Sequence, residues 1–198
     1  MSLPQLRAHL RAARTGLSPR EQRAHAIAAA RRILSEPRLR RATRIAFYQA
    51  ADGELDPASL LALAPKTPRR WYLPVLRPHA AGQLWFVRYR PGDPLQPNRF
   101  GIPEPVHRGR DLHPLPALDL ILMPLVGFDA QCNRLGMGGG YYDRSLAALR
   151  HRHRWHQPLL VGLAHECQRL DQLEPRPWDL PLDAVVTERG IQWRESPS

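Results

Sequence analysis

Residues 127–143 combine glycines with charged and aromatic side chains in a pattern suited to phosphate binding. Four glycines fall within positions 136–140 (Gly-Met-Gly-Gly-Gly). Glycine allows positive φ and close approach of the backbone to a ligand, and successive backbone N–H groups can surround an anion. Because a helix is predicted from about position 140, its N-terminus would add partial positive charge. The segment therefore predicts a phosphate cradle, with a tight structural turn as the alternative.

Charged residues at both ends of this segment favour the phosphate interpretation. The guanidinium of Arg134 can pair with phosphate oxygens, and the carboxylate of Asp143 can hold Mg²⁺ beside them. The alternative role of Asp143 is that of a favourable charge in a first helical turn. The segment is neither a GxxxxGK[ST] loop nor a GxGxxG motif, because Tyr141 stands at the last position of the latter.

Two helices are predicted at the N-terminal end of the chain. Leu3, Leu6 and Leu10 are spaced along one face of a helix over residues 3–14, and three arginines form a second stripe. Ser18 and Glu21 form a capping box that starts a second helix, which runs to about position 34.

Further along the chain, apolar strands alternate with helices. Strands are expected at residues 43–49, 70–76, 84–90, 118–124, 159–164 and, last, 183–187. Short helices are expected at residues 56–63 and 140–150. Residues 91–117 are predicted to be a long loop. This alternation predicts one α/β domain over residues 1–198, a three-layer, Rossmann-like arrangement in which a mostly parallel sheet has helices on both faces. Ligands of such sheets bind at the carboxyl ends of the strands.

Composition narrows the class of protein. The net charge is +11, but the basic residues are dispersed and lack the interleaved aromatics of a nucleic-acid stacking platform. No apolar run reaches the ~18 residues of a membrane span, and the start of the chain lacks a signal-peptide core. The two cysteines fit no metal-ligand spacing. We therefore expect a cytoplasmic protein with no nucleic-acid or membrane partner.

The run from Asn133 to Asp143, NRLGMGGGYYD, resembles the signature of the 5-formyltetrahydrofolate cyclo-ligase family. Weaker similarities to that family follow in order along nearly the whole chain, at residues 6–7, 17–19, 48–55, 100–105, 119–121, 127–129, 177–179 and 183–187. The resemblance implies ATP- and Mg²⁺-dependent conversion of 5-formyltetrahydrofolate to 5,10-methenyltetrahydrofolate, with release of ADP and phosphate. In that reaction ATP phosphorylates the formyl oxygen and N10 closes the ring. The family resemblance also implies a monomer.

The resemblance assigns roles to residues by position. It implies ATP binding by Arg7, Arg134, Leu135, Gly136, Met137, Gly138, Gly139, Gly140, Tyr141 and Tyr142. It implies folate binding by Gln49, Glu54, Phe100, Met137, Gly138, Gly139, Gly140 and Tyr141. Arg134 and Tyr142 would be catalytic, and Asp143 and Asp179 would be the magnesium ligands.

Some family members have a lysine near the start of the first helix and an Arg-Gly-Lys-Gly loop, whereas this chain has Leu3 and Met137-Gly138-Gly139-Gly140. Arg134, Arg144 or Arg7 must then neutralise the transferred phosphate. Three rival functions remain open: a kinase or nucleotide hydrolase, which the missing GK[ST] loop disfavours; a basic RNA-binding module; and an inactive folate-binding relative. His151, His153 and His156 are interpreted as a solvated helix end, and the five tryptophans as packing residues.

Overall fold

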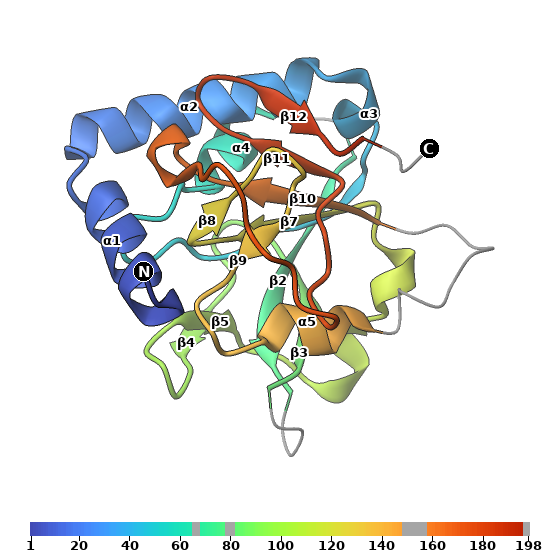
Figure 1. Ribbon diagram of the computed structural model, residues 1–198. Coiled ribbons are helices and arrows are strands. Elements are labelled where there is room, and N and C mark those ends of the chain that lie inside the picture. Colours follow the sequence, from blue (N-terminus) through green and yellow to red (C-terminus); the bar gives the residue numbers. More distant parts are fainter. Residues whose placement is uncertain (65–67, 78–81, 148–157, 196–198) are drawn as a thin grey trace.

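The structure, a computed structural model, describes residues 1–198 except 65–67, 78–81, 148–157 and 196–198 (Figure 1). Within this part of the chain it forms one eight-stranded sheet. In spatial order the strands are β12 (Ile191–Trp193), β11 (Ala184–Val186), β10 (Leu159–Leu163), β7 (Leu120–Pro124), β1 (Arg44–Ala46), β2 (Arg70–Leu76), β3 (Leu84–Tyr89) and β6 (Leu112–His113). The five strands from β11 to β2 are parallel, and β12, β3 and β6 pair antiparallel.

The central strand β7 shows why this sheet has two covered faces. Leu120, Ile121, Leu122 and Met123 are all fully buried. Because successive strand residues point to opposite faces, Leu120 and Leu122 join one apolar cluster, while Ile121 and Met123 join the other. Such an uninterrupted apolar strand requires cover on both faces, as predicted.

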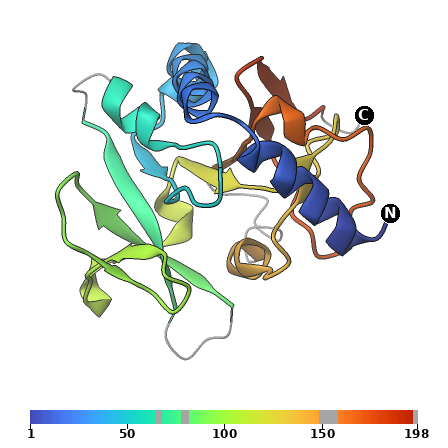
Figure 2. The same ribbon diagram turned by 90° about the vertical axis from the view of Figure 1, so that its left-hand side faces the viewer.

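Helices supply part of that cover. They are α1 (Leu3–Thr15), α2 (Pro19–Ser35), α3 (Pro37–Arg40), α4 (Ala58–Leu63) and α5 (Tyr141–Leu146), with short 3₁₀ turns at Gly109–Asp111, Leu115–Ala117 and Glu166–Gln168. The predicted capping box of α2 is confirmed, since Ser18 N donates to Glu21 at 2.8 Å and Glu21 N donates to Ser18 Oγ at 3.3 Å. Figures 1 and 2 show α2 on one side of the sheet and α5 on the other.

The order of the strands creates a switch point between β1 and β7. From β1 the chain continues through α4 to the neighbouring β2, whereas from β7 it continues on the opposite side to β10. The loops that follow β1 and β7 therefore diverge at the same edge of the sheet, where doubly wound folds bind their ligands.

Several predicted boundaries were wrong. The predicted loop at 91–117 contains a hairpin of β4 (Leu95–Pro97) and β5 (Pro103–Pro105), as well as β6, which pairs with β3. The strand at 43–49 is only Arg44–Ala46, and β12 follows the strand that was expected to be last. Strands β4 and β5 contain proline, and β1, β6 and β12 are only two or three residues long, so tertiary pairing rather than local pattern determines them. The helix predicted from position 140 ends at Leu146 in the described residues, and residues 148–150 lie outside them.

Close packing at the sheet is expected to make Gly162 intolerant of a side chain. A Cβ at Gly162, in β10, would lie 2.6 Å from Leu125 Cδ2 and 2.6 Å from Leu182 Cδ1. We expect Gly162→Ala to lower the free energy of unfolding by about 1–3 kcal/mol, as overpacking typically does, when measured by urea denaturation. Gly109→Ala, whose Cβ would meet nothing within 4 Å, is the control. Equal losses in the two variants would contradict this account of the packing.

Among the described residues, no helix has both the length and the apolar character needed to cross a membrane.

Candidate active site

A cleft of about 1760 Å³ opens at the carboxyl ends of β1, β2 and β7. Its walls are α1, the loop after β1, the β4–β5 hairpin, the glycine-rich segment and residues 172–181. Every residue that the sequence assigned to ATP, folate or magnesium lines this cleft. The structure thus brings together positions spread from Arg7 to Asp179, although it does not test their roles.

A short hairpin positions the residues at the start of the glycine-rich segment. Strands β8 (Gly127–Phe128) and β9 (Arg134–Leu135) pair antiparallel, and Asp129 closes the turn between them. The buried Asp129 carboxylate accepts bonds from the backbone N–H groups of Gln131 (3.0 Å) and Asn133 (2.9 Å). It also accepts bonds from Asn133 Nδ2 and Leu173 N, each at 2.9 Å. A fully bonded buried carboxylate rigidifies its turn, so Arg134 leaves the hairpin in a fixed direction.

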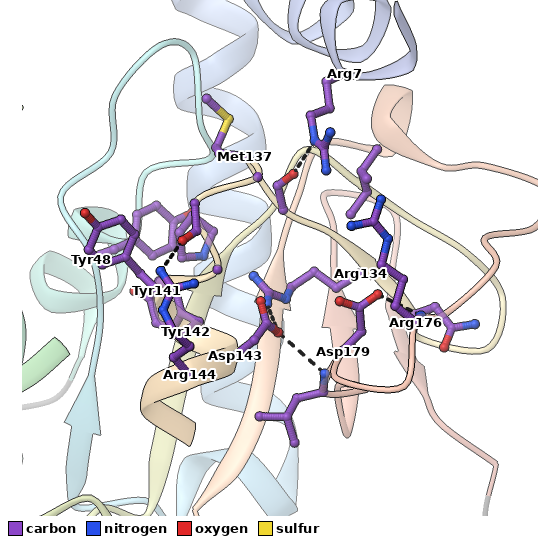
Figure 3. A pocket seen from close by; sticks show the side chains of 18 of the residues that line it. Arg7, Tyr48, Arg134, Met137, Tyr141, Tyr142, Asp143, Arg144, Arg176 and Asp179 are labelled. Atoms are coloured by element: carbon purple, nitrogen blue, oxygen red, sulfur yellow. Dashed lines mark hydrogen bonds and ion pairs between the residues drawn. The ribbon is translucent and has the colours of Figure 1, made fainter. Parts of the chain in front are cut away.

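Arg134 and Asp143 form an ion pair inside the cleft (Figure 3). Arg134 Nη2 lies 2.6 Å from Asp143 Oδ1, with 6% of the Arg134 side chain and 17% of the Asp143 side chain exposed. Leu180 N also donates to the same Asp143 oxygen at 3.5 Å. Arg134 Nε is buried without a hydrogen-bond partner among the described atoms. An unsatisfied donor of this kind is costly, so the guanidinium retains capacity for an anionic ligand.

Backbone conformation in the glycine-rich segment explains two of its glycines. Gly138 has φ of +99° and Gly140 has φ of +63°. Residues with a Cβ atom rarely adopt such positive φ values. Arg7 Nε donates to Gly136 O at 2.8 Å, and Arg144 donates to the carbonyl groups of Gly139 and Gly82. The loop is therefore held at both ends by guanidinium groups that also line the cleft.

The arginine stripe on α1 faces this cleft and the loop after β1. Arg14 is 1% exposed; its Nε donates to Asp52 O at 2.8 Å and its Nη1 donates to Leu125 O at 3.2 Å. Its Nη2 lies 3.7 Å from Glu54 Oε1. Arg11 Nε, which is exposed, binds Asp52 Oδ2 at 2.7 Å. The spacing of the arginines predicted the stripe, but nothing in it distinguished the buried Arg14 from the exposed Arg11.

The surroundings of three cleft residues raise their pKa values. Burial raises the pKa of the Glu54 carboxyl, and the Arg14 guanidinium opposes that shift. Burial, reinforced by the charge of Glu54, raises the pKa of Tyr142 and of Tyr48 well above the ordinary value. Both tyrosines are therefore neutral at physiological pH, and Tyr48 Oη donates to Leu55 O at 2.5 Å. Tyr142 can act as a hydrogen-bond donor but not as a base.

The β4–β5 hairpin adds an apolar wall. Phe100 at its tip is 55% exposed and makes an edge-on contact with Tyr141 at 5.8 Å between ring centroids. Arg99 Nη2 donates to Tyr141 Oη at 2.7 Å. Ile102 and Met137 are also exposed here. Exposed apolar side chains that line a cleft are typical of a binding site for an organic small molecule.

The two predicted magnesium ligands come from adjoining segments. Leu180, whose N–H reaches Asp143, directly follows Asp179, and Asp179 Oδ2 accepts a bond from Arg176 N at 2.9 Å. Each carboxylate keeps a second oxygen, and a pair of carboxylates with substrate phosphates is the donor set that Mg²⁺ prefers. The residues fit the ion, although Arg134 competes for Asp143.

Two other interpretations have different outcomes. Trp178, interpreted as a packing residue, is 58% exposed at the rim of the cleft, so that prediction was wrong for this tryptophan. His151, His153 and His156 lie outside the described residues.

The sequence profile of the 5-formyltetrahydrofolate cyclo-ligase family matches residues 2–188 of the chain. This chain belongs to that family. The 5-formyltetrahydrofolate cyclo-ligase of Escherichia coli K12 is 43% identical over 185 residues, which cover 93% of this chain and 100% of that protein. The cyclo-ligase of Haemophilus influenzae is 37% identical over 182 residues, covering 92% of this chain and 95% of its own length. Membership of the cyclo-ligase family identifies the chain as a ligase.

Solved structures agree with the family fold. The NMR structure of 5,10-methenyltetrahydrofolate synthetase from Aquifex aeolicus superposes with a TM-score of 0.80 at 29% identity, over 100% of this chain and 96% of that one. The methenyltetrahydrofolate synthetase of Mycoplasma pneumoniae shares the fold, with a TM-score of 0.70 at 23% identity, over 95% of this chain and 99% of that one. The Rossmann-like sheet inferred from the sequence is thereby confirmed as the cyclo-ligase fold.

Proposed function

We propose that this protein converts 5-formyltetrahydrofolate to 5,10-methenyltetrahydrofolate at the expense of ATP, releasing ADP and phosphate. The observation that carries the proposal is the composition of this cleft. Guanidinium groups of Arg7, Arg134 and Arg144 surround the glycine-rich loop, and Glu54 and Phe100 line the same cavity. One part of the cleft thus suits polyphosphate, and another suits a polar heterocycle.

ATP is needed because the formyl group on N5 is an amide and therefore a poor electrophile. Transfer of the γ-phosphoryl group to the formyl oxygen makes that oxygen a leaving group. N10 then attacks the activated carbon, the five-membered ring closes, and the C–O bond breaks to release phosphate. The protein contributes mainly positioning and charge stabilisation to such a reaction.

Each cleft residue has a role that its geometry permits. Arg134, with an unpartnered Nε, would pair with the transferred phosphoryl group. The loop from Gly136 to Tyr141 would donate N–H groups to phosphate oxygens. The neutral hydroxyl of Tyr142 would donate a further hydrogen bond. Gln49 and Glu54 would orient the pterin ring beside Phe100.

Asp143 and Asp179 would hold Mg²⁺, which neutralises phosphate charge when it is bound. Since Asp143 is paired with Arg134 here, the same carboxylate orients the guanidinium before the nucleotide arrives. A monomer in the cytoplasm is part of the proposal, on the strength of the family resemblance.

The test is to mix purified protein with 5-formyltetrahydrofolate and Mg-ATP and to follow the near-ultraviolet absorbance of the methenyl product. We expect product only when ATP and Mg²⁺ are both present, and loss of most turnover in Asp143→Ala. Asp171→Ala, an exposed acid outside the cleft lining, should keep full activity. Folded protein that binds ATP and folate without forming product would overturn the proposal and indicate an inactive folate-binding relative.

A further inference from the structure

A second group of ligand-type side chains lies at the same edge of the sheet, outside the cleft lining. His165 follows β10, Glu188 follows β11, and His25 reaches them from α2. Because β10 and β11 are parallel, His165 and Glu188 emerge side by side at the carboxyl ends of their strands. We propose that His25, His165 and Glu188 bind a Zn²⁺ ion.

The ligand atoms are close enough to share one ion. One donor atom of each residue lies within 4.8 Å of the donor atoms of the other two. His25 Nδ1 is 3.0 Å from His165 Nδ1 and 3.8 Å from Glu188 Oε2. Ligands bound tetrahedrally at about 2.0–2.1 Å are separated by distances in this range. Small movements of the side chains would therefore complete the site.

The ring of His165 is oriented as a metal-binding histidine requires. It is fully buried, and its Nε2 lies 3.2 Å from the carbonyl oxygen of Gly53. A carbonyl only accepts, so Nε2 carries the proton and Nδ1 presents its lone pair to His25. A metal-binding histidine typically donates its other N–H group to a carbonyl in this way. Burial and the neighbouring His25 lower the pKa of His165, which favours the neutral ring that a metal needs.

Glu188 is held in place as well. Its two carboxylate oxygens accept the backbone N–H of Glu166 at 3.3 and 3.1 Å, and Arg32 donates to the Glu188 carbonyl at 2.9 Å. Two imidazoles and a carboxylate with a free fourth position form a donor set suited to Zn²⁺. Mg²⁺ prefers oxygen ligands and is not expected there, so this site is chemically distinct from the Asp143 and Asp179 pair.

A bound ion would also restrain the loop after β1. The carbonyl that orients His165 belongs to Gly53, between Asp52 and Glu54. Zn²⁺ would tie α2 and the ends of β10 and β11 to the segment that carries Glu54. The expected role is structural, and the inference does not depend on the proposed reaction.

The test is a Zn²⁺ titration of full-length, tag-free protein against a chromophoric chelator. His151, His153 and His156 are replaced by alanine in every protein tested, so that binding to them does not contribute. We expect one Zn²⁺ per chain and no change in the control His9→Ala. Loss of an outer-shell partner alone weakens metal affinity by about 10–100-fold, so His25→Ala and Glu188→Gln, which alter direct ligands, should weaken it by at least that much. With Zn²⁺ at about 100 times its dissociation constant, Tm should rise by about 5–10 °C. Excess Mg²⁺ should not displace the ion.

His25→Ala places a good helix former in α2, and Glu188→Gln keeps the acceptor oxygen, so both variants should fold. Absence of stoichiometric Zn²⁺ binding would overturn the proposal and leave the histidine pair as a hydrogen bond only. Binding that survives both substitutions would overturn it equally, because the ion would then lie elsewhere.

Discussion

Replacement of Arg134 by alanine is expected to lower turnover of 5-formyltetrahydrofolate and ATP by about 100-fold or more. Removing one preorganised donor to developing negative charge typically costs this much in kcat, and among the described residues Arg134 is the guanidinium whose buried Nε lacks a hydrogen-bond partner. The measurement is kcat under saturating substrates, together with the affinity for ATP in the absence of folate. Turnover within about threefold of the parent protein would show that another cation neutralises the transferred phosphate.

The same substitution should destabilise the fold, and a second variant separates the two effects. Arg134→Ala leaves the Asp143 carboxylate, 17% exposed, without its partner, which typically costs about 3 kcal/mol for a buried pair. Adding Asp143→Ala removes that unpaired charge. The double variant is expected to recover most of the lost free energy of unfolding in urea. Its turnover should stay low for either reason, because Asp143→Ala alone is expected to remove most activity, so the turnover of Arg134→Ala itself is measured at a temperature at which that variant is shown to be folded. Parallel recovery of stability and activity would reduce Arg134 to a structural role.

The second large effect is expected at Arg14. This side chain is 1% exposed and bonds Asp52, Glu54 and the Leu125 carbonyl. Arg14→Met keeps much of the volume but leaves buried acceptors and the Glu54 charge uncompensated. We expect the free energy of unfolding at neutral pH to fall by about 3–5 kcal/mol. Arg11→Met removes an ion pair with the same Asp52 that is shorter but exposed. It should lower the free energy of unfolding by only about 0–1 kcal/mol.

The pH dependence gives Arg14 a further signature. Burial raises the pKa of Glu54, and Arg14 opposes the shift, so Arg14→Met should raise that pKa further. An acid with a raised pKa in the folded state destabilises the fold where it is charged. The difference in free energy of unfolding between the parent protein and Arg14→Met should therefore be largest at neutral pH. It should shrink as the pH falls through the raised pKa of Glu54, when measured by urea denaturation at several pH values. A deficit independent of pH would implicate lost packing alone.

Local signals determined which parts of the structure were predictable. The capping box at Ser18, the apolar strand β7 and the glycine-rich loop each depend on a few neighbouring residues, and each was recognisable. Strand β6 pairs with β3, from which the β4–β5 hairpin separates it along the chain, and β12 is a three-residue strand that pairs with the preceding β11. Their own short sequences therefore carried little signal.

The difference between local signals and long-range contacts also determined which parts of the candidate active site could be predicted. The resemblance placed Arg134 and Asp143 within a single motif, and the structure joins them by an ion pair. The burial of Arg14 depends on Leu125 and Asp52, which are far from it along the chain. His25 and His165 are separated by 140 positions, and no spacing rule relates them. Contacts between such remote residues become visible only when the sheet order is known.

The bond between Arg7 and Gly136 spans 129 positions, and this separation has a consequence for biosynthesis. As the chain leaves the ribosome, α1 emerges before Leu125 and the glycine-rich loop, so Arg7 and Arg14 at first lack these partners. The nascent protein therefore cannot assemble the wall of the cleft that we propose to bind phosphate until most of the sheet has been synthesised. In a series of ribosome-bound chains of increasing length, nucleotide affinity should therefore appear abruptly, once the glycine-rich loop has emerged. It should not increase gradually with chain length after α1 has been synthesised.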